Sequence, residues 1–155
     1  MRRIVLDDLQ GEPIRLLLEE HLRDMRAWSP PCSVHALDLD RLRRPEISFW
    51  TVWESGDLLG CGALKDLGEG EAEIKSMRTA NKHRGKGVGA EMLAHILSTA
   101  KQRGIKRLNL ETGTQTQFAP ARALYARHGF TACGPFADYK LDTYSCFMAI
   151  TLATK

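Results

Sequence analysis

The feature that most constrains this chain is a glycine-rich turn, HRGKGVGAEML at residues 83–93, that leads directly into a helical pattern. Closely spaced glycines let the backbone approach an anion, and the free N–H groups at a helix start favour negative charge. The residues after the turn recur at helical spacing, with one apolar face made of Val88, Met92, Leu93, Ile96, Leu97 and Ala100. The stretch therefore predicts an anion site at the start of an amphipathic helix.

Three kinds of phosphate-binding turn use glycines in this way. The nucleotide triphosphatase loop needs G-x-x-x-x-G-K-S/T, which no window of the sequence supplies. A dinucleotide-binding turn needs G-x-G-x-x-G/A, which Gly85, Gly87 and Ala90 satisfy, with Glu111 following about twenty residues later. Against it, the polar residues 80–84 precede the turn where a hydrophobic strand should end, and no second βαβ half follows.

The third kind of turn has the pattern Arg/Gln-x-x-Gly-x-Gly/Ala, which Arg84, Gly87 and Gly89 match. It forms a pyrophosphate cradle between a strand and a helix. The neighbours agree with this pattern, because an alternating stretch at 71–79 precedes the turn and an amphipathic helix follows it. A strand with a carboxylate, residues 106–113, and a helix with a tyrosine, residues 118–129, come next.

The rest of the chain divides into strands and helices without repeats or linkers. Residues 34–46 have no clear period and fit a short helix or a loop. The expected elements are a strand at 2–8, a helix at 11–28 with Pro13 in its first turn, a hairpin at 47–64 around Gly56 and Asp57, strands at 71–79 and 106–113, helices at 88–104 and 118–129, and strands at 130–136 and 145–153. This order predicts an α/β or α+β domain with a mixed sheet.

Composition excludes several classes of protein. A chain of 155 residues fits one domain, and no stretch approaches the roughly 20 apolar residues of a membrane span. The net charge of +3 suits a small polyanionic ligand and is too dispersed to indicate nucleic-acid binding. The N-terminus lacks the apolar core of a signal peptide. Four cysteines without metal-ligand spacing indicate a cytoplasmic protein with reduced thiols and no metal site.

Four motifs, in order, resemble the GNAT family of N-acetyltransferases. They are the hairpin FWTVWESGDLLGCGALKD, the stretch EIKSMRTANKHRGKGVGAEML, the strand NLETG and the helix ARALYARHGF. The resemblance covers most of the chain and implies one N-acetyltransferase domain over residues 1–155. It also implies a mixed, largely antiparallel sheet that is splayed between two parallel strands and flanked by helices. The apolar strand 145–153 fits either a strand shared in a homodimer or a buried edge within one chain.

The resemblance further implies that acetyl-coenzyme A is the co-substrate, bound between the strands 73–79 and 109–113. Its thioester end would be held by backbone groups of Met77, Arg78 and Thr79. Its pyrophosphate would lie on the turn, whose residues are Arg84, Gly85, Lys86, Gly87, Val88, Gly89 and Ala90. The chemistry agrees independently, because coenzyme A carries several phosphate charges and a pantetheine arm that forms strand-like hydrogen bonds.

Acetyl transfer to an amine needs one proton removed from the attacking ammonium and one delivered to the departing thiolate. Tyr125 resembles the family tyrosine that protonates the sulfur. Glu73 and Glu111 are both candidates for the base, and the sequence leaves the choice between them open. Strand alternation places Glu73 on the same face as Lys75 and Met77. Direct attack by the amine requires no nucleophilic side chain.

The acceptor is expected to be a primary amine of a small molecule or peptide. It would be bound by the first helix, by residues 29–44 and by residues 135–147. Acids in or beside these segments that could attract an ammonium are Asp38, Asp40 and Asp138, and aromatics that could contact an apolar body are Trp28, Trp50 and Tyr139. Two alternatives remain at this point: a coenzyme A binding or sensing module without turnover, and a dinucleotide-binding enzyme.

Overall fold

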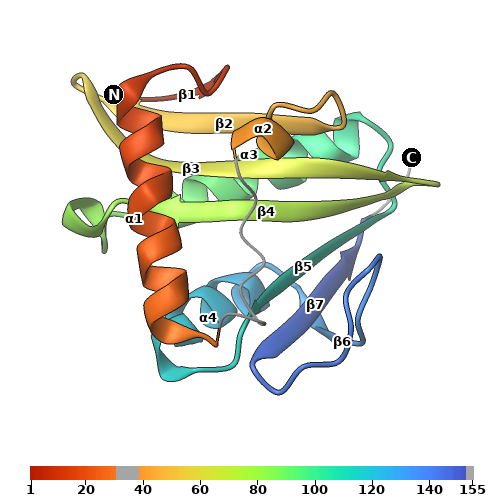
Figure 1. Ribbon diagram of the computed structural model, residues 1–155. Helices are drawn as coiled ribbons and strands as arrows, with labels where there is room; N and C mark the ends of the chain where they lie inside the picture. Colours follow the sequence, from red (N-terminus) through yellow and green to blue (C-terminus); the bar gives the residue numbers. More distant parts are fainter. Residues whose placement is uncertain (31–38, 153–155) are drawn as a thin grey trace.

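The computed structural model describes residues 1–30 and 39–152 and contains one mixed sheet (Figure 1). The strand order is β1-β2-β3-β4-β5-β7-β6, and only the neighbours β4 and β5 run parallel. The strands are β1 (Arg2–Leu6), β2 (Ile47–Glu54), β3 (Asp57–Gly68), β4 (Glu71–Thr79), β5 (Arg107–Gly113), β6 (Thr131–Cys133) and β7 (Ser145–Thr151). The expected mixed, largely antiparallel sheet is confirmed.

Helices cover both faces of the sheet (Figure 1). We name the two sides the α1 face, which carries α1 and α2, and the α3 face, which carries α3 and α4. The α-helices are α1 (Glu12–Trp28), α2 (Leu39–Leu42), α3 (Val88–Gln102) and α4 (Ala119–Arg127). Two single turns of 3-10 helix, η2 (Asn81–His83) and η3 (Thr116–Phe118), precede α3 and α4.

Each face has its own apolar core. On the α3 face, Met92, Leu93 and Ile96 of α3 pack against Leu64, Ile74, Leu108 and Leu110 of the sheet. On the α1 face, Ile14 and Leu17 of α1 and Leu42 of α2 pack with Phe49, Cys61 and Ala63. The apolar stripes read from the sequence for α1 and α3 are the ones that lie buried, because a 3.6-residue period places them on one side of each helix.

The parallel strands β4 and β5 pair over only part of their length. Their register runs from Glu71 opposite Arg107 to Ile74 opposite Leu110, and then the strands separate (Figure 1). Beyond this point β5 continues to pair with β7, up to Gly113 opposite Ser145. The second half of β4 therefore has a neighbour on its β3 side and an opening on its β5 side.

A bulge in β4 lies at the start of this opening. Opposite β3, the partner of Ala63 is Lys75 and the partner of Cys61 is Arg78, so Ser76 and Met77 together oppose Gly62. Ser76 adopts a left-handed conformation with φ of 54°. An extra residue in one strand reverses the alternation of side chains beyond it.

The bulge corrects one prediction about β4. Simple alternation placed Met77 on the face of Glu73 and Lys75, but Met77 packs against the α3-face core, close to Met92. Lys75 and Arg78 stay on the α1 face, opposite Ala63 and Cys61. The prediction was wrong because nothing in the sequence marks Ser76 as the site of an inserted residue.

The strand near the C-terminus is internal to the sheet. β7 pairs with β5 on one side and with β6 on the other, both antiparallel. Its apolar character is therefore explained by burial within one chain. Of the segment 34–46, whose structure the sequence left open, the described part contains the short helix α2, and residues 34–38 lie outside the described residues.

Candidate active site

A cavity of about 620 Å³ opens where β4 and β5 separate. Residues 73–79 of β4 and 111–113 of β5 form two of its walls. The glycine-rich turn, the start of α3 and α4 form another, and the C-terminal half of α1 closes the side opposite α3. The opening between the strands thus connects the two faces of the sheet at one point.

The cavity brings together nearly all the residues predicted for the site. Those that line it are Glu73, Met77, Arg78, Thr79, Arg84, Gly85, Gly87, Val88, Gly89, Ala90, Glu111 and Tyr125. Lys86 is the exception, because its side chain is turned to His83, with 3.0 Å between Nζ and Nδ1, while its carbonyl accepts a hydrogen bond from Arg2. The roles given to these residues remain predictions.

The turn has the backbone geometry that its glycines allow. Gly85 and Gly87 have φ of 78° and 80°, in the left-handed region where side chains are strained. Gly87 is the N-cap of α3 and provides no side-chain hydrogen bond to the first turn of the helix. At Gly89 a Cβ would lie 3.2 Å from Leu124 of α4, so the two helices meet closely there. The start of α3 is left without a side-chain cap and can bind an anion.

The side chain of Arg78 connects β4 to α1. Its guanidinium is almost completely buried and pairs with Glu20 at 2.9 Å and with Asp24. It also donates a hydrogen bond to Asn81 at 3.2 Å. Only the backbone of Arg78 is then left for a ligand, as the sequence analysis expected for this residue.

Arg84 is held more loosely than Arg78. Its guanidinium lies 3.9 Å from Asp24 and 5.9 Å from the centre of the Trp28 ring, and half of its side chain is exposed. A half-exposed ion pair at this distance contributes little to stability. Arg84 is therefore a cation at the cavity wall whose present partners do not fix it strongly.

The bulge of β4 is supported from behind by a thiol. Cys61 Sγ donates a hydrogen bond to the carbonyl of Ser76 at 3.2 Å. Burial raises the pKa of the Cys61 thiol to about 12, so it remains protonated at neutral pH. A protonated thiol is a poor nucleophile. Cys61 therefore holds the backbone of the bulge and does not favour a covalent mechanism.

Glu111 and Tyr125 lie on different elements and interact across the cavity. Burial raises the pKa of Glu111 to about 7; the Ser145 hydroxyl and the charge of Lys75 oppose this rise. Burial also raises the pKa of Tyr125 on α4, and the negative charge of Glu111 raises it further. Near neutral pH Glu111 exchanges a proton readily, whereas Tyr125 keeps its proton as a donor.

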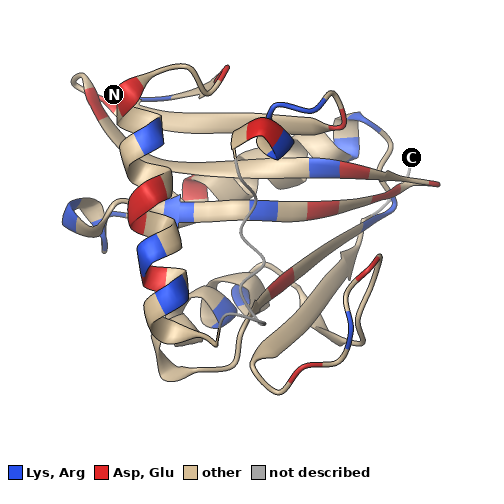
Figure 2. Cartoon of the chain, viewed as in Figure 1, with Lys and Arg blue, Asp and Glu red and all other residues tan. Residues whose placement is uncertain are grey.

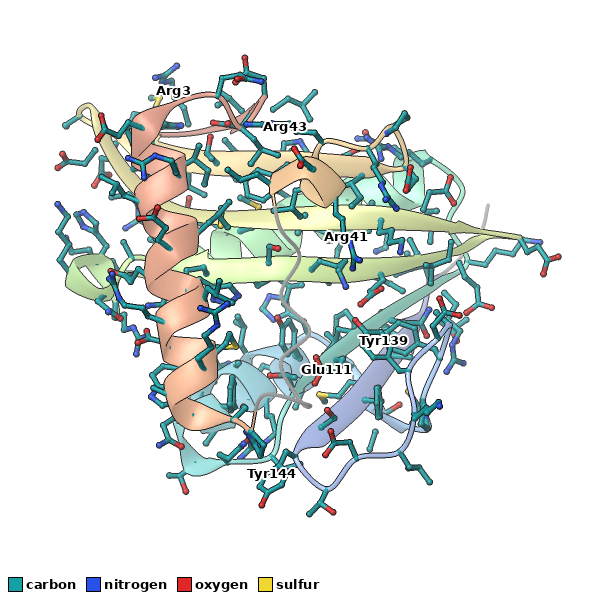
Figure 3. All side chains as sticks on the ribbon, in the orientation of Figure 1. Arg3, Arg41, Arg43, Glu111, Tyr139 and Tyr144 are labelled. Atoms are coloured by element: carbon teal, nitrogen blue, oxygen red, sulfur yellow. The ribbon has the colours of Figure 1, made fainter. Side chains whose placement is uncertain are left out.

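Glu73 lies in a different environment from Glu111. Its Oε2 accepts a hydrogen bond from the Tyr139 hydroxyl at 2.6 Å and pairs with Lys75 Nζ at 3.0 Å. Lys75 Nζ is also 3.0 Å from the Tyr139 hydroxyl, which closes a three-membered cluster. Figure 3 shows Tyr139 and Glu111 in the same region of the α1 face.

Lys75 and His21 are among the polar residues of the cavity that were given no role from the sequence. Lys75 follows Glu73 by two residues on a strand, which was a usable signal that they share a face. His21 lies in the buried stripe of α1, four residues after Leu17 and four before Met25. Burial and the nearby charge of Arg78 lower the pKa of His21 to about 4, and among the described residues its Nδ1 has no hydrogen-bond partner.

The residues expected to contact the acceptor divide into two groups. Trp28 and Tyr139 line the cavity. Trp50 does not, because it is buried in the α3-face core with its ring 5.0 Å from that of His95. Asp138 is exposed and outside the cavity lining, and Asp40 is turned to Arg43 at 3.8 Å. Asp38 lies outside the described residues.

Two further findings concern the described ranges 1–30 and 39–152. Within them, histidine, cysteine and carboxylate side chains nowhere gather in a group of three that could hold a metal ion. No helix in this part of the chain combines the length and the apolar character needed to cross a membrane.

Comparison with known proteins agrees with the geometry. Residues 14–130 match the acetyltransferase (GNAT) family. Uncharacterized N-acetyltransferase YsnE of Bacillus subtilis (strain 168) is 52% identical over 145 residues, 94% of this chain and 96% of that protein. Uncharacterized N-acetyltransferase YedL of Escherichia coli (strain K12) is 47% identical over 152 residues, 98% of this chain and 96% of that protein.

A solved structure shows the same fold. The Bacillus subtilis acetyltransferase in complex with CoA superposes with a TM-score of 0.69 at 17% identity, covering 99% of this chain and all of that one. The chain belongs to the GNAT family of acetyltransferases and is an acyltransferase.

Proposed function

We propose that this protein transfers the acetyl group of acetyl-coenzyme A to a primary amine of a small molecule or peptide by direct attack. The observation that carries the proposal is that Glu111 and Tyr125 line the same cavity. Both side chains line the cavity where β4 and β5 separate, close enough for the charge of Glu111 to affect the pKa of Tyr125. One group is suited to take a proton and the other to give one.

Three parts of the chain would bind the co-substrate. The second half of β4 lacks a strand on its β5 side, so backbone groups of Met77, Arg78 and Thr79 are available to the pantetheine arm. The uncapped start of α3, with Gly87 at its N-cap, would accept the pyrophosphate. Arg84 adds positive charge beside it, in a position where it is half exposed.

Glu111 and Tyr125 would manage the two protons. As the nitrogen–carbon bond forms and the carbon–sulfur bond breaks, Glu111 takes the proton of the attacking amine. Tyr125 stabilises the departing thiolate through its hydroxyl and returns a proton to the sulfur. We assign the base to Glu111 rather than Glu73, because the Glu73 carboxylate is already bound by Lys75 and Tyr139.

We place this reaction in the cytoplasm. Cys61, Cys133 and Cys146 are free thiols, as expected in a reducing compartment. Acetyl-coenzyme A as co-substrate is consistent with that location.

Thermal denaturation with acetyl-coenzyme A, NADH and ATP in parallel tests the binding step. A ligand at about 100 times its Kd adds roughly 2.7 kcal/mol, which raises Tm by several degrees for a chain of this size. We expect a rise with acetyl-coenzyme A alone, and its loss in Arg84→Glu. Arg44→Glu reverses a charge on an exposed residue outside the cavity lining and should keep the rise. A rise with NADH instead of acetyl-coenzyme A would contradict the proposal.

A further inference from the structure

The cluster formed by Glu73, Lys75 and Tyr139 has no role in the mechanism above. Glu73 and Lys75 come from β4, and Tyr139 comes from the irregular segment 134–144 between β6 and β7. Their contacts measure 2.6 Å for Tyr139 to Glu73, 3.0 Å for Lys75 to Glu73 and 3.0 Å for Lys75 to Tyr139. The side chains of Lys75 and Glu73 are only 9% and 4% exposed.

The hydrogen bonds of the cluster are mutually consistent. Tyr139 donates to the Glu73 carboxylate and accepts from the Lys75 ammonium, while Lys75 also donates to the same carboxylate oxygen. The Tyr139 ring is held in turn by Phe136 and Phe147, with ring centres 5.0 and 5.6 Å away. One positive and one negative charge are thus fixed in place with no net charge between them.

The cluster flanks Glu111. Glu73 is paired with Asn109, two residues before Glu111, so both carboxylates project from neighbouring strands onto the same face. All three members of the cluster line the cavity with Glu111. Figure 2 shows that β4 carries residues of both charge signs along its length.

Other titratable or polar groups also face Glu111 from the surrounding elements. α4 contributes Tyr125 and the segment 134–144 contributes Asp142 in addition to Tyr139. β7 contributes the Ser145 hydroxyl and the Cys146 thiol. Among these groups in the described chain, Lys75 is the cation whose charge acts on Glu111, and Glu73 is one of two carboxylates that oppose it.

Two carboxylates that interact strongly in one cavity titrate as a coupled pair. We infer that Lys75 and Tyr139 are positioning residues that hold the Glu73 carboxylate and balance its charge, so that Glu111 is left as the carboxylate that takes the acceptor's proton. This inference rests on the proposed function for its catalytic consequence, and on the contacts of the cluster for its electrostatic part. Removing the Lys75 charge would leave Glu73 as an uncompensated anion beside Glu111.

Titration of the Glu111 carboxyl by carbon-13 NMR, with Glu111 assigned from the Glu111→Gln spectrum, tests the electrostatic part without any substrate. In Lys75→Met we expect the pKa of Glu111 to rise by about 1 unit or more, because a nearby anion disfavours its ionisation. In Glu73→Gln we expect the pKa to fall. In the double variant Glu73→Gln/Lys75→Met the two effects oppose each other, and the value should return to within about 0.5 of wild type.

In each variant, the acid limb of the plot of kcat/KM against pH should move in the same direction as the pKa of Glu111. Lys75→Arg keeps the positive charge, so the pKa of Glu111 and the acid limb should stay near their wild-type positions. Lys101→Met removes a lysine charge from an exposed residue of α3 outside the cavity lining and should also leave the pKa and the acid limb unchanged, because solvent screens it. A merely structural role for Lys75 does not produce shifts of opposite sign in the two single variants.

Two results would overturn the inference: an unchanged or lowered pKa of Glu111 in Lys75→Met, or a double variant that does not return toward wild type. If Lys75→Met fails to fold, the comparison of Glu73→Gln, in which the Lys75 ammonium keeps its hydrogen bond to Tyr139, with the double variant still decides. A pKa of Glu111 that is no higher in the double variant than in Glu73→Gln would overturn the inference. The two proposals can fail separately. If the variants show the expected pKa shifts of Glu111 but the protein turns over no amine, the proposed function is contradicted and the electrostatic inference is supported.

Discussion

The paired and the separated halves of β4 and β5 place polar side chains in different surroundings. In the paired half, the amide of the fully buried Asn109 donates to Glu71 and to the carbonyl of Ala72, each at 3.2 Å. In the separated half, a cavity takes the place of the neighbouring strand, and Glu111 is the first β5 residue beyond the last pair. No cation in the described chain forms an ion pair with Glu111.

Burial alone does not explain this contrast. Glu73, with 3% of its surface exposed, is more enclosed than Glu111, yet it has a cation and a hydroxyl as partners. Glu111 is also partly buried but has no cation of the described chain fixed against its carboxylate, so burial raises its pKa to about 7. Glu111 is therefore a chemically available group because, unlike Glu73, it is enclosed where the strands separate without an ion pair from the described residues.

The largest expected effect lies at the point of separation. Glu111→Gln keeps the size of the side chain and removes its ability to take a proton, so kcat/KM should fall by about 10² to 10⁴-fold. Glu71→Gln makes the same change in the paired half, where the carboxylate only meets Asn109 and Arg107, and should stay within about twofold of wild type. Steady-state kinetics with the acceptor found in an amine screen measures both. If kcat/KM fell equally in Glu111→Gln and Glu71→Gln, the separated half of the strands would have no special role in the reaction.

Glu111→Gln should also raise the free energy of unfolding in mildly alkaline solution. The pKa of Glu111 rises from 4.5 to about 7, so the native state holds this proton more tightly than the unfolded chain does. The associated stability is present below about pH 4.5 and is lost as the pH rises through 7. Because Gln does not titrate, Glu111→Gln should exceed wild type by up to about 3 kcal/mol at pH 8. Urea denaturation at pH 5 and pH 8 measures this; an equal difference at both would contradict it.

In the paired half, a substitution is expected to lower the stability of the protein without changing the pH dependence of the reaction. Asn109→Leu removes the donor to Glu71 and Ala72 and the acceptor of Arg107, so the free energy of unfolding should fall by about 1–3 kcal/mol. The acid limb of the pH–rate profile should not move, because Asn109 carries no charge and lines no part of the cavity. Urea denaturation and a pH–rate profile on one preparation test both statements. A displaced acid limb would show that the halves are coupled.

Much of the fold was predictable because local patterns agree with it. The apolar stripe from Val88 to Ala100 predicted α3, and Gly56 with Asp57 predicted the hairpin of β2 and β3. Gly104, with φ of 76°, lies just beyond the end of α3, as a C-terminal glycine should. These signals depend on residues close in sequence, and such residues keep their relation in the folded chain.

The parts that were not predictable depend on distant residues or on strain. Ser76 adopts a positive φ that its residue type does not announce, so the bulge and the position of Met77 could not be predicted. Tyr139 meets Glu73 from 66 positions away, in a segment without regular structure. The choice between Glu73 and Glu111 depended on that contact, and the sequence therefore left it open.

The two separate apolar cores have a consequence for how such a protein changes over generations. The α3-face core supports α3 and the turn before it, whereas the α1-face core supports α1 and α2. Substitutions that share no packing partners combine nearly additively. Under the proposed function, a descendant can therefore vary the buried apolar residues of α1 for a new acceptor and keep those of α3, while Asp24 and Trp28 of α1 still contact Arg84 of the turn.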